Sequence, residues 1–340
     1  MINSSPFIHS DNSVQKLMFK VQLATMPALI VHIYFFGFGI TLQWMLGLVT
    51  LVIVEASLLK LRQRPVIPFL TDFSGLVTVT LLVFCIPPES PWWVIVTGVS
   101  FSLIFGKHLF GGLGYNPFNP AMLGYAFLLI SFPAELTQWT LPSTISEHSL
   151  SFIDSIYYIF TGGIPNFDIN QVTGATPLDK IKTDLTTGIQ VSKTLHSSLF
   201  HLNSYPYGWT EVNIAFMVGG LWLLLNGTIR WQYPVGFLGS LALMAGIFHF
   251  IDPDTYAPVS VHLFSGGIML AAFFIITDPV TSSTTPRGRL VFAIGIGCLV
   301  YIIRNWGAFP DGIAFAVLLL NMCVPFIDQY TKPRVTGYKR

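Results

Sequence analysis

Apolar segments long enough to cross a lipid bilayer dominate this sequence of 340 residues. Hydrophobic residues make up 52% of the chain and charged residues only 10%, whereas a soluble domain usually carries about 25% charged residues. So few charges do not suffice for the surface of a soluble protein. The composition therefore predicts a polytopic membrane protein. The net charge of +1 gives no reason to expect nucleic acid as a partner.

Ten segments are candidates for transmembrane helices, because a spanning helix needs roughly 20 mostly apolar residues. Lipid offers no water to an unpaired backbone, so these segments must be helical. We predict an all-α polytopic membrane protein with about ten transmembrane helices, forming a single integral membrane domain over residues 1–340. The segments are Met18–Phe36, Ile40–Leu59, Thr71–Ile86, Trp92–Phe110, Pro120–Phe132, Asn213–Leu225, Pro234–Ile251, Val261–Thr277, Leu290–Ile303 and Gly312–Ile327.

The lysines and arginines predict the orientation of these helices. If the N-terminus is cytoplasmic and the spans alternate, all basic residues face the cytoplasm except Lys180, Lys182, Lys193 and Arg304. Cytoplasmic loops carry an excess of basic residues, so this arrangement is the expected one. Both termini are then cytoplasmic, and the long polar segment Pro133–Val212 is an extracytoplasmic loop. Within that loop, Leu150–Phe160 is too short to span and is either an interfacial helix or a packed piece of loop.

A faint internal symmetry suggests that the chain consists of two inverted five-helix halves, a common plan among transporters. The evidence is an alignment of the fifth predicted helix with the tenth. The matching pairs are Pro120 and Pro310, Ala126 and Ala316, Leu128 and Leu318, and Leu129 and Leu319.

The polar loop contains the run Thr173-Gly174-Ala175-Thr176, which offers an accessible hydroxyl among small neighbours. Gly174 lets the backbone turn freely, and small side chains leave room for a modifying enzyme. The pattern is short, however, and an ordinary loop turn is the alternative interpretation of the run.

A second unusual run, Gly111–Pro120, combines glycines with two Asn-Pro pairs between the fourth and fifth predicted helices. Proline interrupts a helix, so this run is either a tight turn or broken backbone that lines a cavity. In the second case, the carboxamides of Asn116 and Asn119 are candidates for hydrogen bonds to a planar heterocycle. The run lacks the glycine spacing of phosphate or dinucleotide loops, so we expect no NADH site.

Ionisable residues within the spans are candidates for an ion path, since a buried charge in a bilayer usually has a role. They are Glu55, Asp72 and Asp278, with Thr281 close to the last. Structural carboxylates at helix ends are the alternative for Asp72 and Asp278. Ser265-Gly266-Gly267 allows close helix approach upstream of Asp278. The three cysteines form no metal-binding pattern, so no metal site is expected.

Four stretches together resemble a known family, and the resemblance covers essentially the whole chain. They are GGLGYNPFNPAMLGYAFLLISFP, TGATPLD, SGGIMLAAFFIITDPVTSSTTPRGRL and PDGIAFAVLLLNMCVPFIDQYTKPRVTG. The family includes the D subunit of the bacterial Rnf (Rsx) ion-translocating electron-transport complex and the B subunit of the sodium-translocating NADH:quinone oxidoreductase. The chain starts close to its first predicted helix, without the longer N-terminal extension typical of the latter protein, which favours the Rnf type.

The resemblance implies a flavoprotein subunit of the bacterial inner membrane, with the Thr176 loop in the periplasm. It implies FMN bound covalently to Thr176 through a phosphoester and a second, non-covalent riboflavin, for which Asn116 and Asn119 are the candidates. It also implies partner subunits that carry a second covalent FMN and iron–sulfur centres, and electron transfer coupled to movement of Na⁺ or H⁺. Two alternatives from other classes remain: a cofactor-free solute channel or transporter, and an assembly scaffold.

Overall fold

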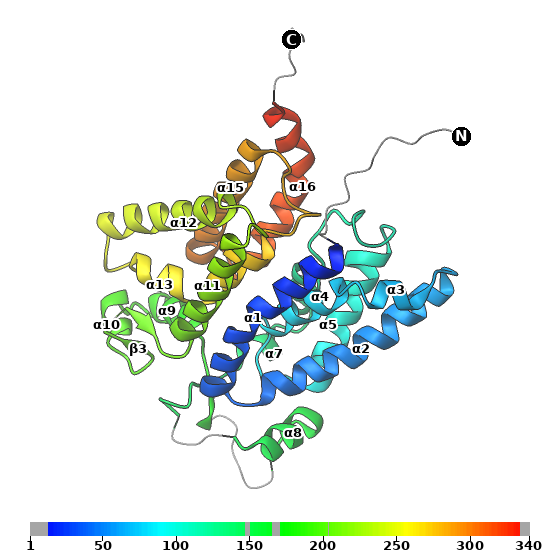
Figure 1. Cartoon of the computed structure of the whole chain (residues 1–340). Coiled ribbons are helices and arrows are strands. Elements are labelled where there is room, and N and C mark those ends of the chain that lie inside the picture. The colour runs from blue at the N-terminus through cyan, green and yellow to red at the C-terminus, as the bar shows by residue number, and fades with distance from the viewer. Residues whose placement is uncertain (1–12, 147–149, 165–170, 203, 334–340) are drawn as a thin grey trace, which may run out of the picture.

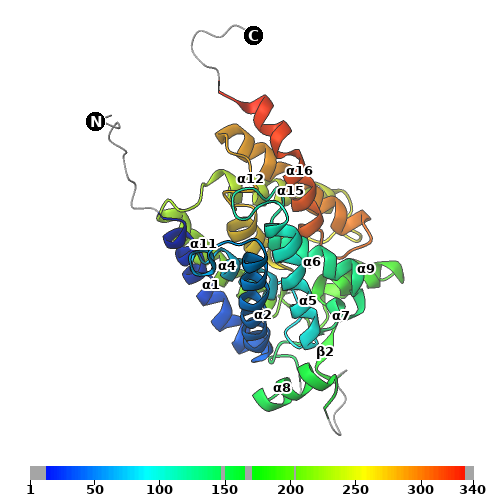
Figure 2. The same cartoon turned by 90° about the vertical axis from the view of Figure 1, so that its right-hand side faces the viewer.

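The computed structural model describes residues 13–146, 150–164, 171–202 and 204–333, and the fold is mainly helical (Figures 1 and 2). Among these residues, five helices are long and apolar enough to cross a bilayer. They are α1 (Val14–Phe36), α2 (Gly39–Leu61), α12 (Gln232–Ile251), α15 (Pro286–Trp306) and α16 (Ile313–Thr331). The prediction of a helical membrane protein with several spans therefore agrees with the structure.

The other predicted spans contain shorter helices. The lengths of α4 (Ser74–Val83), α6 (Pro120–Ser131) and α11 (Trp209–Leu225) are 10, 12 and 17 residues. The helix α5 (Trp92–Leu103) continues as the π-helix η1 (Ile104–His108). A short helix of 5 residues, α3 (Val66–Leu70), precedes α4. The total of ten membrane crossings therefore stays a prediction.

The predicted span Val261–Thr277 is not a continuous helix. It consists of α13 (Val259–Phe264), α14 (Ile268–Leu270) and the π-helix η3 (Ala271–Ile275). The break lies at Gly266, whose φ of +63° favours glycine. The side-chain amide of Asn213 donates to the carbonyls of Phe264 and Gly266, and its oxygen accepts from the amide of Met269. A buried side chain thus satisfies the backbone groups that the break releases, as an apolar environment requires.

The helix packing is similar in the two parts of the chain. Helix α5 packs against α2 and α6, and α15 packs correspondingly against α12 and α16; α1 contacts α11, and α6 contacts α16. In each part a glycine allows the close approach, since an added Cβ at Gly124 would overlap Ser102 Oγ and one at Gly297 would overlap Ser240 Oγ. This pattern is what two repeated halves would produce; their inverted relationship stays a prediction.

The polar segment after α6 has secondary structure of its own at one end of the bundle. The start of α1 and the end of α16 lie toward the opposite end from α8 (Figure 1). Strand β1 pairs antiparallel with β2, and β3 with β4. The elements are α7 (Pro133–Thr137), β1 (Trp139–Thr140), α8 (Phe152–Thr161), β2 (Thr173–Gly174), α9 (Pro177–Thr186), α10 (Val191–Leu195), β3 (Phe200–His201) and β4 (Tyr205–Pro206).

The predicted helix at Leu150–Phe160 is present as α8, which begins with a capping box formed by Ser151 and Asp154. Its aromatic and aliphatic residues Phe152, Ile153 and Phe160 are exposed, as expected of a helix lying at a membrane surface. Its buried face includes Ser155, whose hydroxyl donates to Glu89 Oε1 at 2.8 Å.

Glu89 connects α8 to the bundle and gives the fold a dependence on pH. Burial raises the pKa of this carboxyl from 4.5 to about 7. The folded chain therefore prefers the protonated form, so the stabilisation is complete below about pH 4.5 and is lost as the pH rises through 7. At 1.36 kcal/mol per pKa unit, the loss is about 3 kcal/mol.

We expect Glu89→Gln to remove most of this dependence. Thermal unfolding of the purified chain should show the variant to be more stable than the wild type at pH 8 and similar to it at pH 4.5. Equal stability differences at both pH values would contradict the prediction. Asp154→Asn, on the exposed side of α8, serves as the control.

Candidate functional site

Thr176 is the N-cap residue of α9. Thr173 and Gly174 form β2, which pairs with β1 and fixes the approach to the helix. Thr176 Oγ1 accepts from the backbone amide of Asp179 at 3.2 Å and donates to Asp179 Oδ2 at 2.7 Å. Pro177 occupies the first helical position, where a missing N–H has no consequence. The predicted run is therefore a strand followed by a capped helix start, and its last hydroxyl is held in a defined place.

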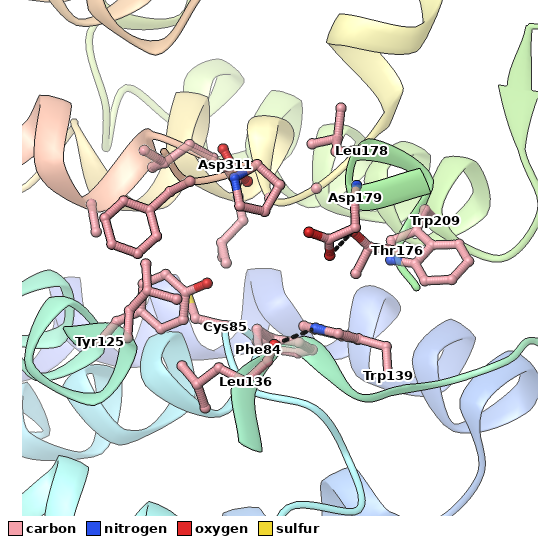
Figure 3. Close-up of a pocket in the computed structure, with 18 of the residues that line it drawn as sticks. Phe84, Cys85, Tyr125, Leu136, Trp139, Thr176, Leu178, Asp179, Trp209 and Asp311 are labelled. Carbon is pink, nitrogen blue, oxygen red and sulfur yellow. Dashed lines mark hydrogen bonds between the residues drawn. The ribbon is translucent and has the colours of Figure 1, made fainter. Parts of the chain in front are cut away.

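Thr176 lies on the wall of a large cavity, which we call the Thr176 cavity. Its walls enclose about 1160 Å³, part of it open to solvent, and they come from the polar segment and from α1, α6, α11 and α14. Thr176, Asp179 and Trp209 lie close together on one side of it, and Trp139 lies across from them (Figure 3). The aromatic rings around the cavity belong to His32, Phe36, Phe84, Tyr125, Trp139, Trp209, Phe216 and Phe309.

The carboxylate of Asp179 is hydrogen-bonded directly to the Thr176 hydroxyl. Burial raises the pKa of Asp179, and the neighbouring Asp311 adds to the effect. In the described part of the chain, Asp179 forms no ion pair within 4 Å. Asp311 is paired with the buried guanidinium of Arg304 at 3.2 Å.

Lys182 fixes α9 to the bundle. Its Nζ donates to the carbonyls of Gly307 at 2.5 Å and Phe309 at 2.9 Å, which follow the last turn of α15. A third carbonyl, that of Arg304, lies at 3.4 Å. A cation at the C-terminal end of a helix is favoured by the helix dipole. Because α9 and α15 are joined in this way, Thr176 keeps a fixed position relative to the cavity.

A second cavity, the Asn116 cavity, brings together several residues that the sequence singled out separately. It encloses about 780 Å³ and is lined by Asn116, Asn119, Lys107 and Asp278, and α1, α4 and η3 also contribute to its walls. The run Gly111–Pro120 therefore lines a cavity, and the interpretation as a tight turn alone is insufficient.

Asn116 and Asn119 differ in what their carboxamides contact. The Asn119 side chain accepts from Met122 N at 3.2 Å and donates to the Ile275 carbonyl at 3.4 Å, and its backbone amide donates to Asn321 Oδ1. Asn119 is therefore used to cap α6 and to join it to η3 and α16. Asn116 donates to Phe118 O at 3.1 Å, while its buried Oδ1 has no hydrogen-bond partner among the described residues. Of the two, Asn116 has capacity left for a ligand.

The carboxylates of the predicted ion path occupy different environments. Asp278 lines the Asn116 cavity and accepts from Val280 N and from Thr281 Oγ1 at 2.9 Å. Asp72 accepts from the amide and hydroxyl of Ser74, so it caps the start of α4. For both carboxylates the structure places hydrogen bonds at helix or turn ends, in agreement with the structural alternative.

Glu55 is part of a buried ion pair. Lys107 Nζ lies 2.5 Å from Glu55 Oε1 and 2.9 Å from Ser74 Oγ, and His108 Nε2 lies 3.4 Å from the same carboxylate oxygen. Lys107 and His108 belong to η1, and Lys107 also lines the Asn116 cavity. Glu55 is thus connected to the cavity through its partner Lys107.

The chain matches a known family over almost its whole length. A model of the NQR2, RnfD, RnfE family matches residues 1–337. The chain belongs to this family. Three similar relatives are each named as the D subunit of an ion-translocating oxidoreductase complex: from Aliivibrio salmonicida (48% identical, covering 100% of this chain and 99% of the relative), Yersinia enterocolitica (48%, 100% and 99%) and Escherichia coli (45%, 100% and 99%). The resemblance inferred from the motifs is confirmed.

In this member of the NQR2, RnfD, RnfE family, a thin layer of residues separates the two cavities. Ala121 on α6 lines the Asn116 cavity and the adjacent Met122 lines the Thr176 cavity. On η3, Phe274 lines the Asn116 cavity and the adjacent Ile275 lines the Thr176 cavity. Short stretches of α6 and η3 therefore stand between the two cavities.

Sequence reasoning missed several residues of this family member's site. Lys107 lies within the predicted span Trp92–Phe110. A lysine followed by further apolar residues was the available signal that this side chain is buried. Asp179 stands three residues after Thr176, the spacing at which a carboxylate meets the N-cap hydroxyl. Trp139 and Trp209 had no signal, since only the fold brings them to Thr176.

Proposed function

We propose that this chain is the membrane flavoprotein subunit of a redox-driven, ion-translocating oxidoreductase complex, with FMN attached to Thr176 through a phosphoester. The observation that carries the proposal is the Thr176 hydroxyl on the wall of a large cavity with aromatic sides. Such a cavity offers flat apolar surfaces to a planar ring system, and the hydroxyl provides the point of attachment. Members of the family that share the whole length of the chain support the proposal, since they are named as subunits of such a complex.

The residues present fit a phosphoester at this position. Thr176 precedes the first turn of α9, a helix of 10 residues, and backbone amides at a helix N-terminus favour a negatively charged phosphate. When bound, FMN supplies one- and two-electron redox chemistry. The chain supplies position: Lys182 fixes α9, and the aromatic walls of the cavity would offer apolar contacts to the ring system.

The Asn116 cavity is the proposed place of a second, non-covalent flavin, riboflavin. The free Oδ1 of Asn116 is an acceptor for a ring N–H of the heterocycle. Asn119 contributes through the shape of the loop, because its own carboxamide is occupied. Two flavins on either side of α6 and η3 would make the chain an electron relay between its two faces.

The proposed coupling ion is Na⁺ or H⁺, and oxygen ligands are what a hard cation requires. Asp278 and Thr281 provide carboxylate and hydroxyl oxygens near the Asn116 cavity. Glu55 provides a carboxylate behind Lys107. Asp72 is the weakest of the proposed ion residues, since Ser74 occupies its carboxylate. An electron placed on a flavin in a low-dielectric bundle attracts a cation over several ångströms, which is the physical basis of coupling.

The proposed surroundings follow from the same family. The chain would lie in a bacterial inner membrane, bound to other membrane and peripheral subunits that include a second FMN-bearing subunit and iron–sulfur subunits. Both termini would face the cytoplasm and the Thr176 loop the periplasm. The support is the distribution of basic residues, together with the position of α8 at the opposite end of the bundle from the start of α1 (Figure 1).

The intact mass of the purified chain tests the attachment directly. The expected result is a mass increase equal to FMN minus water, located by fragmentation on the peptide that contains Thr176. A chain with the unmodified mass, purified from cells that possess a flavin transferase, would overturn the proposal.

A labelling experiment tests the orientation. In a background without Cys85, Cys298 and Cys323, we expect Thr183→Cys on α9 to react with an impermeant maleimide added to cells with a permeabilised outer membrane. Ile67→Cys on α3, an exposed position on the predicted cytoplasmic side, is the matched control and should react only after the inner membrane is lysed. The reverse pattern would place α9 in the cytoplasm.

A further inference from the structure

The Thr176 hydroxyl and the Asp179 carboxylate form a pair with the geometry of an activated nucleophile. Thr176 Oγ1 donates to Asp179 Oδ2 at 2.7 Å, within the distance at which a carboxylate accepts a proton from a reacting hydroxyl. The same oxygen, Oγ1, accepts from Asp179 N at 3.2 Å. Both bonds together orient the hydroxyl, so one of its lone pairs remains for attack on an electrophile.

We propose that Asp179 is the general base for the flavinylation of its own chain. The inference rests on the proposed function, because it concerns the formation of the phosphoester at Thr176. A hydroxyl without a base is a weak nucleophile, and phosphoryl-transfer reactions recurrently use a carboxylate to receive the proton of the acceptor hydroxyl. Here the acceptor chain itself carries that carboxylate, three residues after the hydroxyl.

The step balances with a flavin dinucleotide of the FAD type as the donor. Thr176 Oγ1 attacks the phosphorus of the FMN half, and the new O–P bond forms as the P–O bond of the pyrophosphate breaks. The proton of Thr176 passes to Asp179 Oδ2, and AMP leaves. No electrons are exchanged, and the transferase with its divalent cation supplies the charge stabilisation at the phosphates.

The surroundings of Asp179 suit this role. Burial and the nearby Asp311 raise the pKa of Asp179, which makes its carboxylate a stronger base. Two lysines follow on the same helix, and both have other partners: Lys180 pairs with Asp184, and Lys182 donates to the carbonyls of Gly307 and Phe309. Neither forms an ion pair with Asp179 within 4 Å in the described part of the chain. After transfer, the neutral carboxyl can donate a hydrogen bond to the phosphate instead of repelling it.

Asp184 on the same helix is the matched control. It is also an aspartate of α9, but it pairs with Lys180 at 3.5 Å and accepts from Thr194 Oγ1 at 2.8 Å. Asp184→Asn therefore changes the charge of α9 as much as Asp179→Asn does, without touching the Thr176 hydroxyl.

The experiment measures the rate of flavin incorporation into the full-length chain produced without a transferase. Purified wild type, Asp179→Asn and Asp184→Asn are mixed with FAD, Mg²⁺ and excess flavin transferase, and the intact mass is followed over time. General base catalysis contributes about 100-fold or more, so Asp179→Asn should react at least about 100-fold more slowly than the other two. Circular dichroism verifies that the variant retains its helices.

Several outcomes separate this inference from its alternatives. Incorporation into Asp179→Asn at the wild-type rate would overturn it. So would recovery of the Asp179→Asn rate at a saturating concentration of the transferase, because Asp179 would then serve recognition by the transferase. The ratio of the wild-type rate to the Asp179→Asn rate should rise with pH as the carboxyl loses its proton; a ratio independent of pH would also contradict a base. Absence of flavin from the wild type would instead refute the proposed function.

Discussion

Thr176→Ala is expected to abolish covalent flavin binding and to stop electron transfer through the assembled complex. The reason is that the hydroxyl oxygen is the atom that would join the phosphate, and alanine has none. The mutation also removes the N-cap of α9, which costs about 1 kcal/mol. That cost is small compared with the total stability of the helix bundle, so the chain should still insert and assemble. In-gel flavin fluorescence and the intact mass measure the attachment.

Thr183→Ala is the matched control, since it removes an exposed hydroxyl from the same helix. It should retain the flavin and the wild-type electron-transfer rate. Covalent flavin in the Thr176→Ala chain would mean that another residue carries it. An active Thr176→Ala complex would show that the chain acts as a scaffold in electron transfer.

Glu55→Gln, which removes the buried partner of Lys107 beside the Asn116 cavity, is expected to produce a large loss of stability. The ammonium of Lys107 and the carboxylate of Glu55 are both almost fully buried. Removing one member leaves the other charge in an apolar environment, at a cost of about 3–5 kcal/mol. Thermal or denaturant unfolding of the purified chain in detergent, with circular dichroism as the signal, measures the effect.

Two further variants test the cause. The double variant Glu55→Leu with Lys107→Met removes both charges and should recover most of the lost stability, because an apolar pair needs no compensation. Lys180→Ala breaks the partly exposed pair with Asp184 and should cost less than about 1 kcal/mol. If Glu55→Gln changes stability no more than Lys180→Ala does, the buried pair makes no substantial contribution.

Apolar patterning predicted the fold class well, because lipid imposes helices on any segment long enough to cross it. Each of the ten predicted segments contains helix in the structure. Patterning did not predict the break at Gly266, because the compensating groups come from distant positions. Asn213 and Arg304 satisfy the freed carbonyls there, and neither is close to Gly266 in sequence.

The candidate site was predictable where chemistry is local and unpredictable where it is assembled by the fold. The Thr176 hydroxyl and the loop containing Asn116 are local features, and motif reasoning singled out both, although the helix cap at Thr176 appeared only in the structure. The different roles of Asn116 and Asn119 depend on Met122, Ile275 and other contacts that no spacing reveals. Likewise, Lys107 neutralises Glu55 across 52 positions of sequence, so the sequence made Glu55 appear as an isolated charge.

The three carbonyls around Lys182 have a consequence for how electrons would reach this chain. A cofactor on a long, untethered loop could travel between donor and acceptor as a swinging arm. Here the ammonium anchors α9 to the last turn of α15 and the residues that follow it, so Thr176 stays in place. If Thr176 carries a flavin, as proposed, a redox partner would have to bring its own cofactor to this fixed position.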